Sequence, residues 1–226
     1  GLCTLCLGVP ALMAQQNWDD HDRSNRYTAV EIARNYLNSV GPNGILITHG
    51  DNDTFPLWYA QEVESIRTDV RIVNTSLLGT DWHIDQMKYA VNESAPLPIS
   101  VPYKQYLYGT NEYIPIVDSR NTEMNIHDVM EIFKHPKAKV ELSSGKRVDY
   151  IASRKIVVPV NKENVLKSGI VSAENADKIL DSIVLTIPKG KDYISKPELF
   201  MLDFLAGYDW SRPLQMLNMG GEINVG

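Results

Sequence analysis

The spacing of apolar and polar positions predicts alternating strands and helices along most of the chain. Ile45, Leu46 and Ile47 form a short continuous apolar run, which is typical of a strand buried on both faces. A second run at 70–73 follows a segment, 54–65, with apolar residues at helical spacing. That helix offers four apolar side chains for one face: Phe55, Trp58, Tyr59 and Val63. A strand, a helix and another buried strand predict a parallel pair joined by a right-handed crossover.

The same patterns predict the elements in the rest of the chain. Helices are expected at 27–40, 81–91, 125–134, 161–167, 172–180 and 196–206. Strands are expected at 155–160, 183–187 and 214–217, with a β-hairpin formed by 138–142 and 147–151. Asp203 interrupts an apolar helix and is expected to face water. The last strand is expected to return beside the first. The predicted fold is α/β, a parallel-core Rossmann-like sheet with flanking helices and a β-rich insertion at about 136–195.

The first fourteen residues, GLCTLCLGVPALMA, carry no charged side chain and are followed by the acidic cluster Asp19, Asp20 and Asp22. The run is shorter than the roughly 20 residues that a membrane-spanning helix needs. We interpret residues 1–14 as the carboxyl-terminal end of a transmembrane helix whose beginning lies outside this sequence. The alternative is a buried N-terminal helix of a soluble protein. The residues that follow this run are acidic, whereas cytoplasmic flanks of membrane helices tend to be rich in Lys and Arg. We therefore expect the domain at 15–226 to lie on the extracytoplasmic side.

Composition excludes some functions without naming one. The hydrophobic fraction of 43% and the charged fraction of 22% are ordinary for a folded soluble protein. The net charge of −6 argues against a nucleic-acid partner. Cys3 and Cys6 have C-x-x-C spacing, but no second ligand pair follows them, so we interpret them as structural.

Polar side chains gather where the first two predicted strands end. The candidates for ligand binding are His49, Asp51, Asn52, Asp53, Asp81, Trp82 and His83. Ligands of open α/β sheets bind at the carboxyl ends of the strands. If His49, Asp51 and Asp53 point to one side, they suit a divalent metal such as Mg, Mn or Ca, or the hydroxyls of a sugar. Asp53 with Thr54 can instead cap the following helix.

The other polar clusters have simpler interpretations. Asp81 is interpreted as the N-cap of its helix, whereas Trp82 and His83 can stack on a sugar or line the same cleft as Asp51. The acidic cluster before residue 23 is interpreted as a solvated flank, with metal or headgroup contact as the alternative. Arg212 is expected to pair with a carboxylate and Trp210 to pack. The sequence contains no G-x-S-x-G and no H-E-x-x-H, so no catalytic set can be assembled.

The run GDNDTFPLWYAQEVESIRTDVRIVNTSLLGTDWHIDQM resembles a family of large multi-spanning membrane proteins common in Bacteroidetes. That family, formerly a domain of unknown function, is described as protein O-mannosyltransferase-like and related to membrane glycosyltransferases that use lipid-linked sugars. The stretches QQNWDDHDRSNRYTA, IVVPVNKENVLKSGIV and LDFLAGYDWSRPL are similar to it as well, so the resemblance covers nearly the whole chain.

The resemblance implies that this chain is the extracytoplasmic, periplasmic part that follows the last membrane helix of a protein that continues past Gly226. Acidic catalytic residues of such glycosyltransferases lie in loops between early membrane helices, so none can be carried over. The implied role is accessory: binding of a glycan or protein acceptor, a sugar or the membrane-embedded part of the same protein. A second hypothesis is a metal-dependent enzyme, hydrolase-like, using Asp51, Asp53 and His83. A third is a scaffold that only docks against its membrane part.

Overall fold

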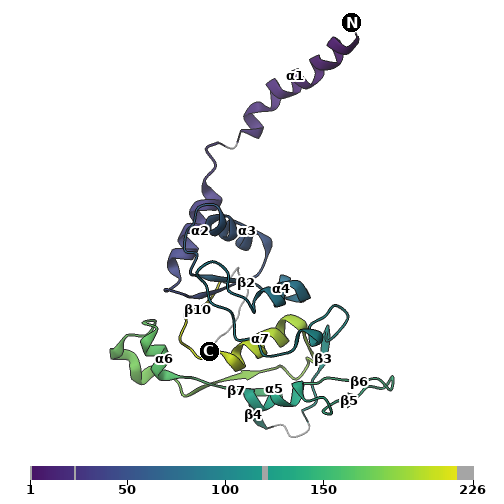
Figure 1. Ribbon diagram of the computed structural model, residues 1–226, viewed down its shortest axis with the longest axis vertical. Coiled ribbons are helices and arrows are strands. Elements are labelled where there is room, and N and C mark those ends of the chain that lie inside the picture. The colour runs from purple at the N-terminus through teal and green to yellow at the C-terminus, as the bar shows by residue number, and fades with distance from the viewer. Residues whose placement is uncertain (1, 23, 119–121, 218–226) are drawn as a thin grey trace.

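The computed structural model describes residues 2–22, 24–118 and 122–217 (Figure 1). The α-helices are α1 (Leu2–His21), α2 (Thr28–Ser39), α3 (Asp51–Glu62), α4 (Asp81–Gln86), α5 (Ile126–Lys134), α6 (Lys162–Lys167) and α7 (Lys196–Gly207). The strands are β1 (Ile45–Thr48), β2 (Arg71–Asn74), β3 (Tyr113–Pro115), β4 (Glu123–Asn125), β5 (Val140–Glu141), β6 (Arg147–Val148), β7 (Lys155–Pro159), β8 (Ser182–Thr186), β9 (Tyr193–Ser195) and β10 (Leu214–Met216). Short 3₁₀ turns occupy η1 (Leu77–Gly79), η2 (Tyr103–Gln105) and η3 (Ala173–Lys178).

Strand β1 is the centre of a three-stranded parallel sheet with the order β10-β1-β2. Ile45 pairs with Leu214 on one side and with Arg71 on the other. The predicted parallel pair is confirmed, and so is the predicted return of the last strand beside the first. All four residues of β1 and all four of β2 are buried, which explains the apolar runs at 45–47 and 72–73.

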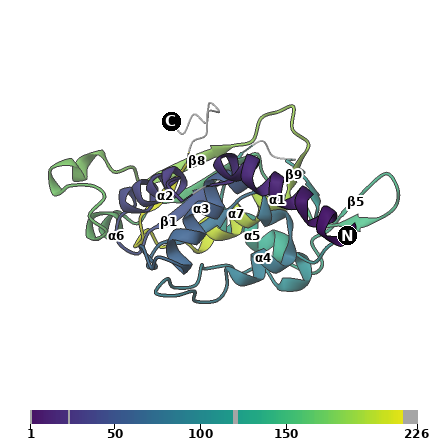
Figure 2. The same cartoon turned by 90° about the horizontal axis from the view of Figure 1, so that it is seen from above.

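The two faces of this sheet pack against different helices. Helices α2 and α3 cover one face, where Leu37 and Leu57 pack with Leu46 and Ile72 (Figures 1 and 2). Helix α7 lies on the opposite side of the sheet in Figure 1, and its Phe200 belongs to the larger hydrophobic core that includes the other face of β1. The sheet is therefore a layer between helices, as the sequence predicts for an α/β fold.

A single Rossmann-like parallel core is not evident in the described part of the chain, and this element of the prediction is wrong. The remaining strands form separate small sheets: β4-β7-β8, with β4 parallel and β8 antiparallel to β7, the antiparallel pair β3-β9, and the hairpin β5-β6. After β2, the six-residue helix α4 ends at Gln86, and Pro96, Pro98 and Pro102 follow. Proline cannot donate a ladder hydrogen bond, so this segment does not add a third crossover strand.

The β-rich content predicted at 136–195 is present, with strands β5 to β9 in that range. These strands pair with one another and with β3 and β4, and they do not extend the leading sheet. The predicted hairpin is confirmed in a shorter form. Helix α4 is also shorter than expected.

Helix α3 differs from the prediction in both its start and its orientation. It begins at Asp51, three residues before the expected start, and its buried residues include Leu57 and Ala60. The side chains of Phe55 and Tyr59 are exposed. The predicted apolar face is therefore wrong for Phe55, Tyr59 and Val63, whereas Trp58 packs against the core cluster that includes Leu57. The small Ala60 allows α3 to approach its neighbours closely, which the large rings do not.

Asp203 is completely buried, so the prediction that it faces water is wrong. Its Oδ2 accepts hydrogen bonds from the backbone N–H groups of Ser100 at 3.0 Å and Val101 at 2.8 Å. The hydroxyls of Ser100 and Tyr106 also donate to this carboxylate, at 2.6 and 3.3 Å. Asp203 thus satisfies backbone donors of the proline-rich segment, which has few ladder partners of its own.

Arg212 precedes β10 and does not form the expected ion pair with any carboxylate that the structure describes. Its Nε donates to the carbonyl of Asn43 at 2.7 Å, and its Nη2 donates to the hydroxyl of Ser94 at 3.1 Å. Trp210 does pack, with its ring 5.0 Å from that of Tyr208 between centroids. Backbone carbonyls here satisfy the guanidinium without a charge partner.

Helix α1 extends away from the rest of the molecule (Figure 1). The side chains of its residues 6–21 are exposed, and both interpretations of residues 1–14 stay predictions. Within residues 2–22, 24–118 and 122–217, no helix combines the length and hydropathy of a membrane-crossing helix. The thiol of Cys6 is exposed and free, whereas the side chain of Cys3 lies outside the described residues.

Candidate ligand-binding cavity

The predicted convergence of His49, Asp51 and Asp53 does not occur. Because α3 begins at Asp51, its first residues follow the helical period of about 100° per residue and not the two-residue period of a strand. Asp53 turns back, and its carboxylate accepts hydrogen bonds from the backbone N–H groups of His49 at 2.8 Å and Gly50 at 2.9 Å. Asp51 and Asn52 are exposed.

A buried polar network closes the carboxyl ends of β1 and β2. The hydroxyl of Thr54 donates to the carbonyl of Gly50 at 2.7 Å, lies 2.7 Å from the hydroxyl of Thr48, and accepts from Nδ2 of Asn74 at 2.9 Å. The capping interpretation therefore holds for Asp53, whereas the hydroxyl of Thr54 donates to a carbonyl and caps no backbone N–H. The exposed ring of His49 lies 2.9 Å from the hydroxyl of Thr75, beside this network.

The described residues form no cluster of metal ligands that supports the metal hypothesis. Among the described residues, no group of three or more His, Cys, Asp or Glu side chains is close enough to hold a metal ion. The carboxylate of Asp53 is already engaged by two backbone donors. A divalent cation prefers six or more oxygen ligands, and Asp51 with Asp53 does not provide them.

The polar residues after β2 lie differently from those after β1. Thr80, not Asp81, is the N-cap residue of α4, and the carboxylate of Asp81 accepts from the backbone N–H of Tyr108 at 3.1 Å. The next two residues, Trp82 and His83, line a cavity of about 380 Å³. Asp51 does not line that cavity, so the predicted cleft shared with Asp51 does not form, and the prediction of stacking on a sugar stays a prediction.

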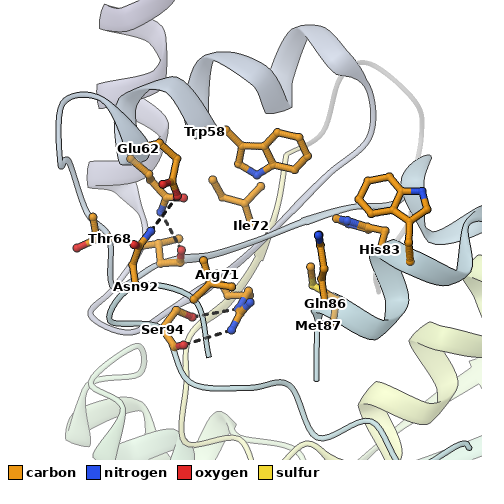
Figure 3. A pocket seen from close by; sticks show the side chains of 14 residues that line it. Trp58, Glu62, Thr68, Arg71, Ile72, His83, Gln86, Met87, Asn92 and Ser94 are labelled. Atoms are coloured by element: carbon orange, nitrogen blue, oxygen red, sulfur yellow. Dashed lines mark hydrogen bonds between the residues drawn. The ribbon is translucent and has the colours of Figure 1, made fainter. Parts of the chain in front are cut away.

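The cavity lies between α3, β2, α4 and residues 91–94. Figure 3 shows Trp58 from α3, Arg71 from β2 and His83 from α4 around it, and Trp82 of α4 also lines it. The ring of His83 lies between the two indoles, 6.3 Å from that of Trp58 and 5.4 Å from that of Trp82. Aromatic walls with a few polar groups are typical of small-molecule sites.

His83 is 1% exposed, and neither of its ring nitrogens has a hydrogen-bond partner among the described residues. Burial, and then the positive charge of Arg71, lower the pKa of His83 to about 4. The ring is therefore neutral at neutral pH and has one donor and one acceptor. No described residue uses either group.

Arg71 is 3% exposed and is held by the loop that follows α4. Its Nε donates to the hydroxyl of Ser94 at 3.2 Å, and its Nη2 donates to the carbonyls of Tyr89 at 2.7 Å and Ala95 at 2.9 Å. Burial, followed by the charge of Arg212, lowers the pKa of Arg71 to about 10, so it remains a cation at neutral pH. These bonds fix the guanidinium at the wall of the cavity.

The mouth of the cavity carries exposed polar side chains. Nδ2 of Asn92 donates to Oε1 of Glu62 at 2.9 Å, whereas the exposed side chain of Gln86 forms no hydrogen bond within the described part of the chain. On the inner side, Nε2 of Gln61 donates to the carbonyls of Arg67 and Val70, each at 2.8 Å. Polar groups therefore surround the aromatic walls.

Sequence reasoning identified Trp82 and His83 but missed Trp58, Arg71 and Gln86. Arg71 gave a signal, because a charged residue within an otherwise apolar buried strand needs special partners. Trp58 was assigned to the packed face of its helix. Gln86 has no sequence feature that separates it from an ordinary surface residue.

These observations define a mixed α/β domain with a small aromatic and polar cavity beside the edge strand of its parallel sheet. The chain belongs to the TMEM260-associated domain 2 family, whose model matches residues 29–224. TMEM260 is a protein O-mannosyltransferase, so the expected relationship to a protein O-mannosyltransferase family is confirmed. The Bacteroidetes origin stays a prediction. No curated protein and no solved structure matches this chain.

Proposed function

We propose that this chain is an accessory domain of a membrane glycosyltransferase-like protein and that it binds a sugar in the cavity between α3, β2 and α4. The domain lies on the extracytoplasmic, periplasmic side and works beside the membrane-embedded part of the same protein, which carries the transfer chemistry. The family match and the acidic flank after the apolar N-terminal run support this context. The sugar belongs to the acceptor or the donor of that reaction.

The observation that carries the proposal is the pair of unpartnered ring nitrogens on buried His83. Leaving a buried polar group without a partner costs about 1–3 kcal/mol, so such groups are rare in native proteins unless they serve a function. A neutral imidazole presents one donor and one acceptor, and a sugar hydroxyl presents the complementary pair.

The rest of the cavity fits the same ligand class. The rings of Trp58 and Trp82 provide apolar surface on two sides of His83. The volume of about 380 Å³ lies in the lower part of the usual range for small-molecule sites, which favours a single sugar ring over a folded peptide.

The test is a binding titration of the 226-residue chain with a panel of monosaccharides. The panel spans neutral methyl glycosides, uronic acids and sugar phosphates, and binding is followed by ligand-observed NMR and by tryptophan fluorescence. His83→Phe keeps a ring of similar size and removes both nitrogens. His127→Phe is the matched control, because His127 is exposed on α5 and does not line the cavity.

We expect one or more sugars to bind the wild type and His127→Phe, and His83→Phe to lose at least tenfold in affinity. That factor corresponds to about 1.4 kcal/mol, a typical cost for a lost hydrogen bond. Unchanged affinity in His83→Phe would place the site elsewhere. Failure of every sugar to bind the wild type would reject the proposal.

A further inference from the structure

We infer that the sugar bound in this cavity carries an acidic group, a carboxylate or a phosphate ester, which pairs with the guanidinium of Arg71. The inference rests on the proposed function and narrows its ligand class. The observation behind it is a buried cation that lines the cavity and forms no ion pair with any carboxylate among the described residues.

Two other sheltered cations of this chain have carboxylate partners. Part-buried Arg67 pairs with Asp69 at 2.8 Å, and the fully buried ammonium of Lys196 lies 2.7 Å from Oε1 of Glu112. Buried charges are usually paired in this way, because desolvation of a lone charge is costly. Arg71 departs from that pattern, as does the less buried Arg212 beside it.

Nearby charges do not compensate Arg71 either. Besides burial, the positive charge of Arg212 repels the guanidinium of Arg71 and lowers its pKa. The carboxylates of Asp209 and Asp69 attract the guanidinium of Arg212, which partly offsets the lowering of that residue's pKa by burial. Of the residues that line the cavity, Glu62 alone is acidic; it is exposed and accepts a hydrogen bond from Asn92.

The guanidinium also has a free donor group. Nε and Nη2 of Arg71 hold the loop through Tyr89, Ser94 and Ala95, but Nη1 donates no hydrogen bond to any residue that the structure describes. An Arg guanidinium binds carboxylate and phosphate oxygens with short, charge-assisted hydrogen bonds. His83 lines the same cavity, and its ring nitrogens have no partner among the described residues.

The competing explanation is that Arg71 only stabilises the loop at 89–95. Replacing Arg71 does not separate the two explanations, because the loop loses its four hydrogen bonds in either case. Gln86 provides a cleaner probe, since it lines the cavity, is exposed and has no hydrogen bond to lose among the described residues. Gln86→Glu and Gln86→Lys place opposite charges at the same position.

The experiment measures dissociation constants by calorimetry for an acidic sugar and its neutral counterpart. Glucuronic acid carries a carboxylate and glucose 6-phosphate carries a phosphate ester. Comparing each of them with glucose shows which acidic group the cavity prefers. The matched controls are Asn52→Glu and Asn52→Lys, which change net charge equally at an exposed position outside the cavity. All variants are made in the 226-residue chain.

We expect an acidic sugar to bind at least tenfold more tightly than glucose. Gln86→Glu lowers the ratio of the affinity for the acidic sugar to that for glucose on the order of fivefold, and Gln86→Lys raises this ratio by a similar factor. A single charge several ångströms from a charged ligand at a protein surface has an effect of this size. The Asn52 variants shift the ratio less than twofold. Equal affinity for acidic and neutral sugars, or the same ratio in both Gln86 variants, overturns this inference and leaves the proposed function standing. Binding of neither sugar class rejects the proposed function itself.

Discussion

Oδ2 of Asp53 accepts a hydrogen bond from the backbone N–H of His49 at 2.8 Å, so this carboxylate fixes the turn between β1 and α3. Asp53→Ala leaves two backbone donors without this partner and is expected to lower the free energy of unfolding by about 1–2 kcal/mol. Asp51→Ala, two residues earlier and exposed, is expected to cost about 0.5 kcal/mol through the helix dipole. Urea denaturation of both variants measures the difference. Neither residue lines the cavity, so sugar binding should survive both changes, and the reverse order of costs would contradict the capping role.

His83→Phe is expected to stabilise the ligand-free protein. The substitution removes two ring nitrogens that are buried without partners, and we expect a gain of about 1–2 kcal/mol in the free energy of unfolding at pH 7. The measurement is the urea midpoint of the wild type and the variant, with His127→Phe as the control. A loss of stability would mean that the nitrogens of His83 are hydrogen-bonded in solution.

The buried neutral imidazole also predicts a pH dependence. The pKa of His83 is lowered from 6.5 to about 4, so the unfolded chain binds more protons than the folded one between these values. The contribution of His83 to stability is fully present above pH 6.5 and falls by about 3 kcal/mol as the pH drops to 4. His83→Phe lacks this loss. The stability gap between the variant and the wild type should therefore widen by about 2 kcal/mol from pH 7 to pH 4.5, and a constant gap would show that the pKa of His83 is not lowered.

Asp203 connects α7 to the proline-rich segment, and its removal should be costly. Asp203→Ala leaves the amides of Ser100 and Val101 unsatisfied, and we expect a loss of at least about 3 kcal/mol. Tyr106→Phe removes one longer bond and should cost about 1 kcal/mol. Asp128→Ala, at an exposed site on α5, is the control. Hydrogen exchange adds a local readout: the amides of Ser100 and Val101 should lose protection in Asp203→Ala, and retained protection would mean that they have other partners.

The parts of the fold that the sequence predicts well are those where burial demands a clear pattern. Strand β1 is buried on both faces, and its apolar run is continuous from Ile45 to Ile47. Helix α2 has a strong amphipathic repeat and lies within one residue of its predicted bounds at both ends. The expected position of the last strand beside the first is also confirmed.

The parts that could not be predicted depend on contacts between distant segments. Strands β3, β4 and β9 are three residues long, too short for any periodicity to appear. Asp203 looks like a surface residue until the backbone of Ser100 approaches it. Three-dimensional contacts override local pattern at these positions.

The candidate site was predicted in part for the same reason. Trp82 and His83 follow β2 along the chain, but their cavity contacts the beginning of that strand, at Arg71 and Ile72, and not its carboxyl end. Asp51 and Asp53 do lie after the carboxyl end of β1, where the general rule places ligands, but α3 begins early enough to use them in its first turn. A string of turn-forming residues does not reveal at which residue a helix begins, and boundaries are the least reliable part of such predictions.

The register between β1 and β10 has a consequence for biosynthesis. Ile45 pairs with Leu214, about 170 residues later in the chain. At roughly 5–20 residues per second on the ribosome, one edge of β1 in the nascent polypeptide stays unprotected for about 10–30 s. An apolar strand with a bare edge readily joins other chains, so we expect chaperones to shield this segment until translation has passed Met216.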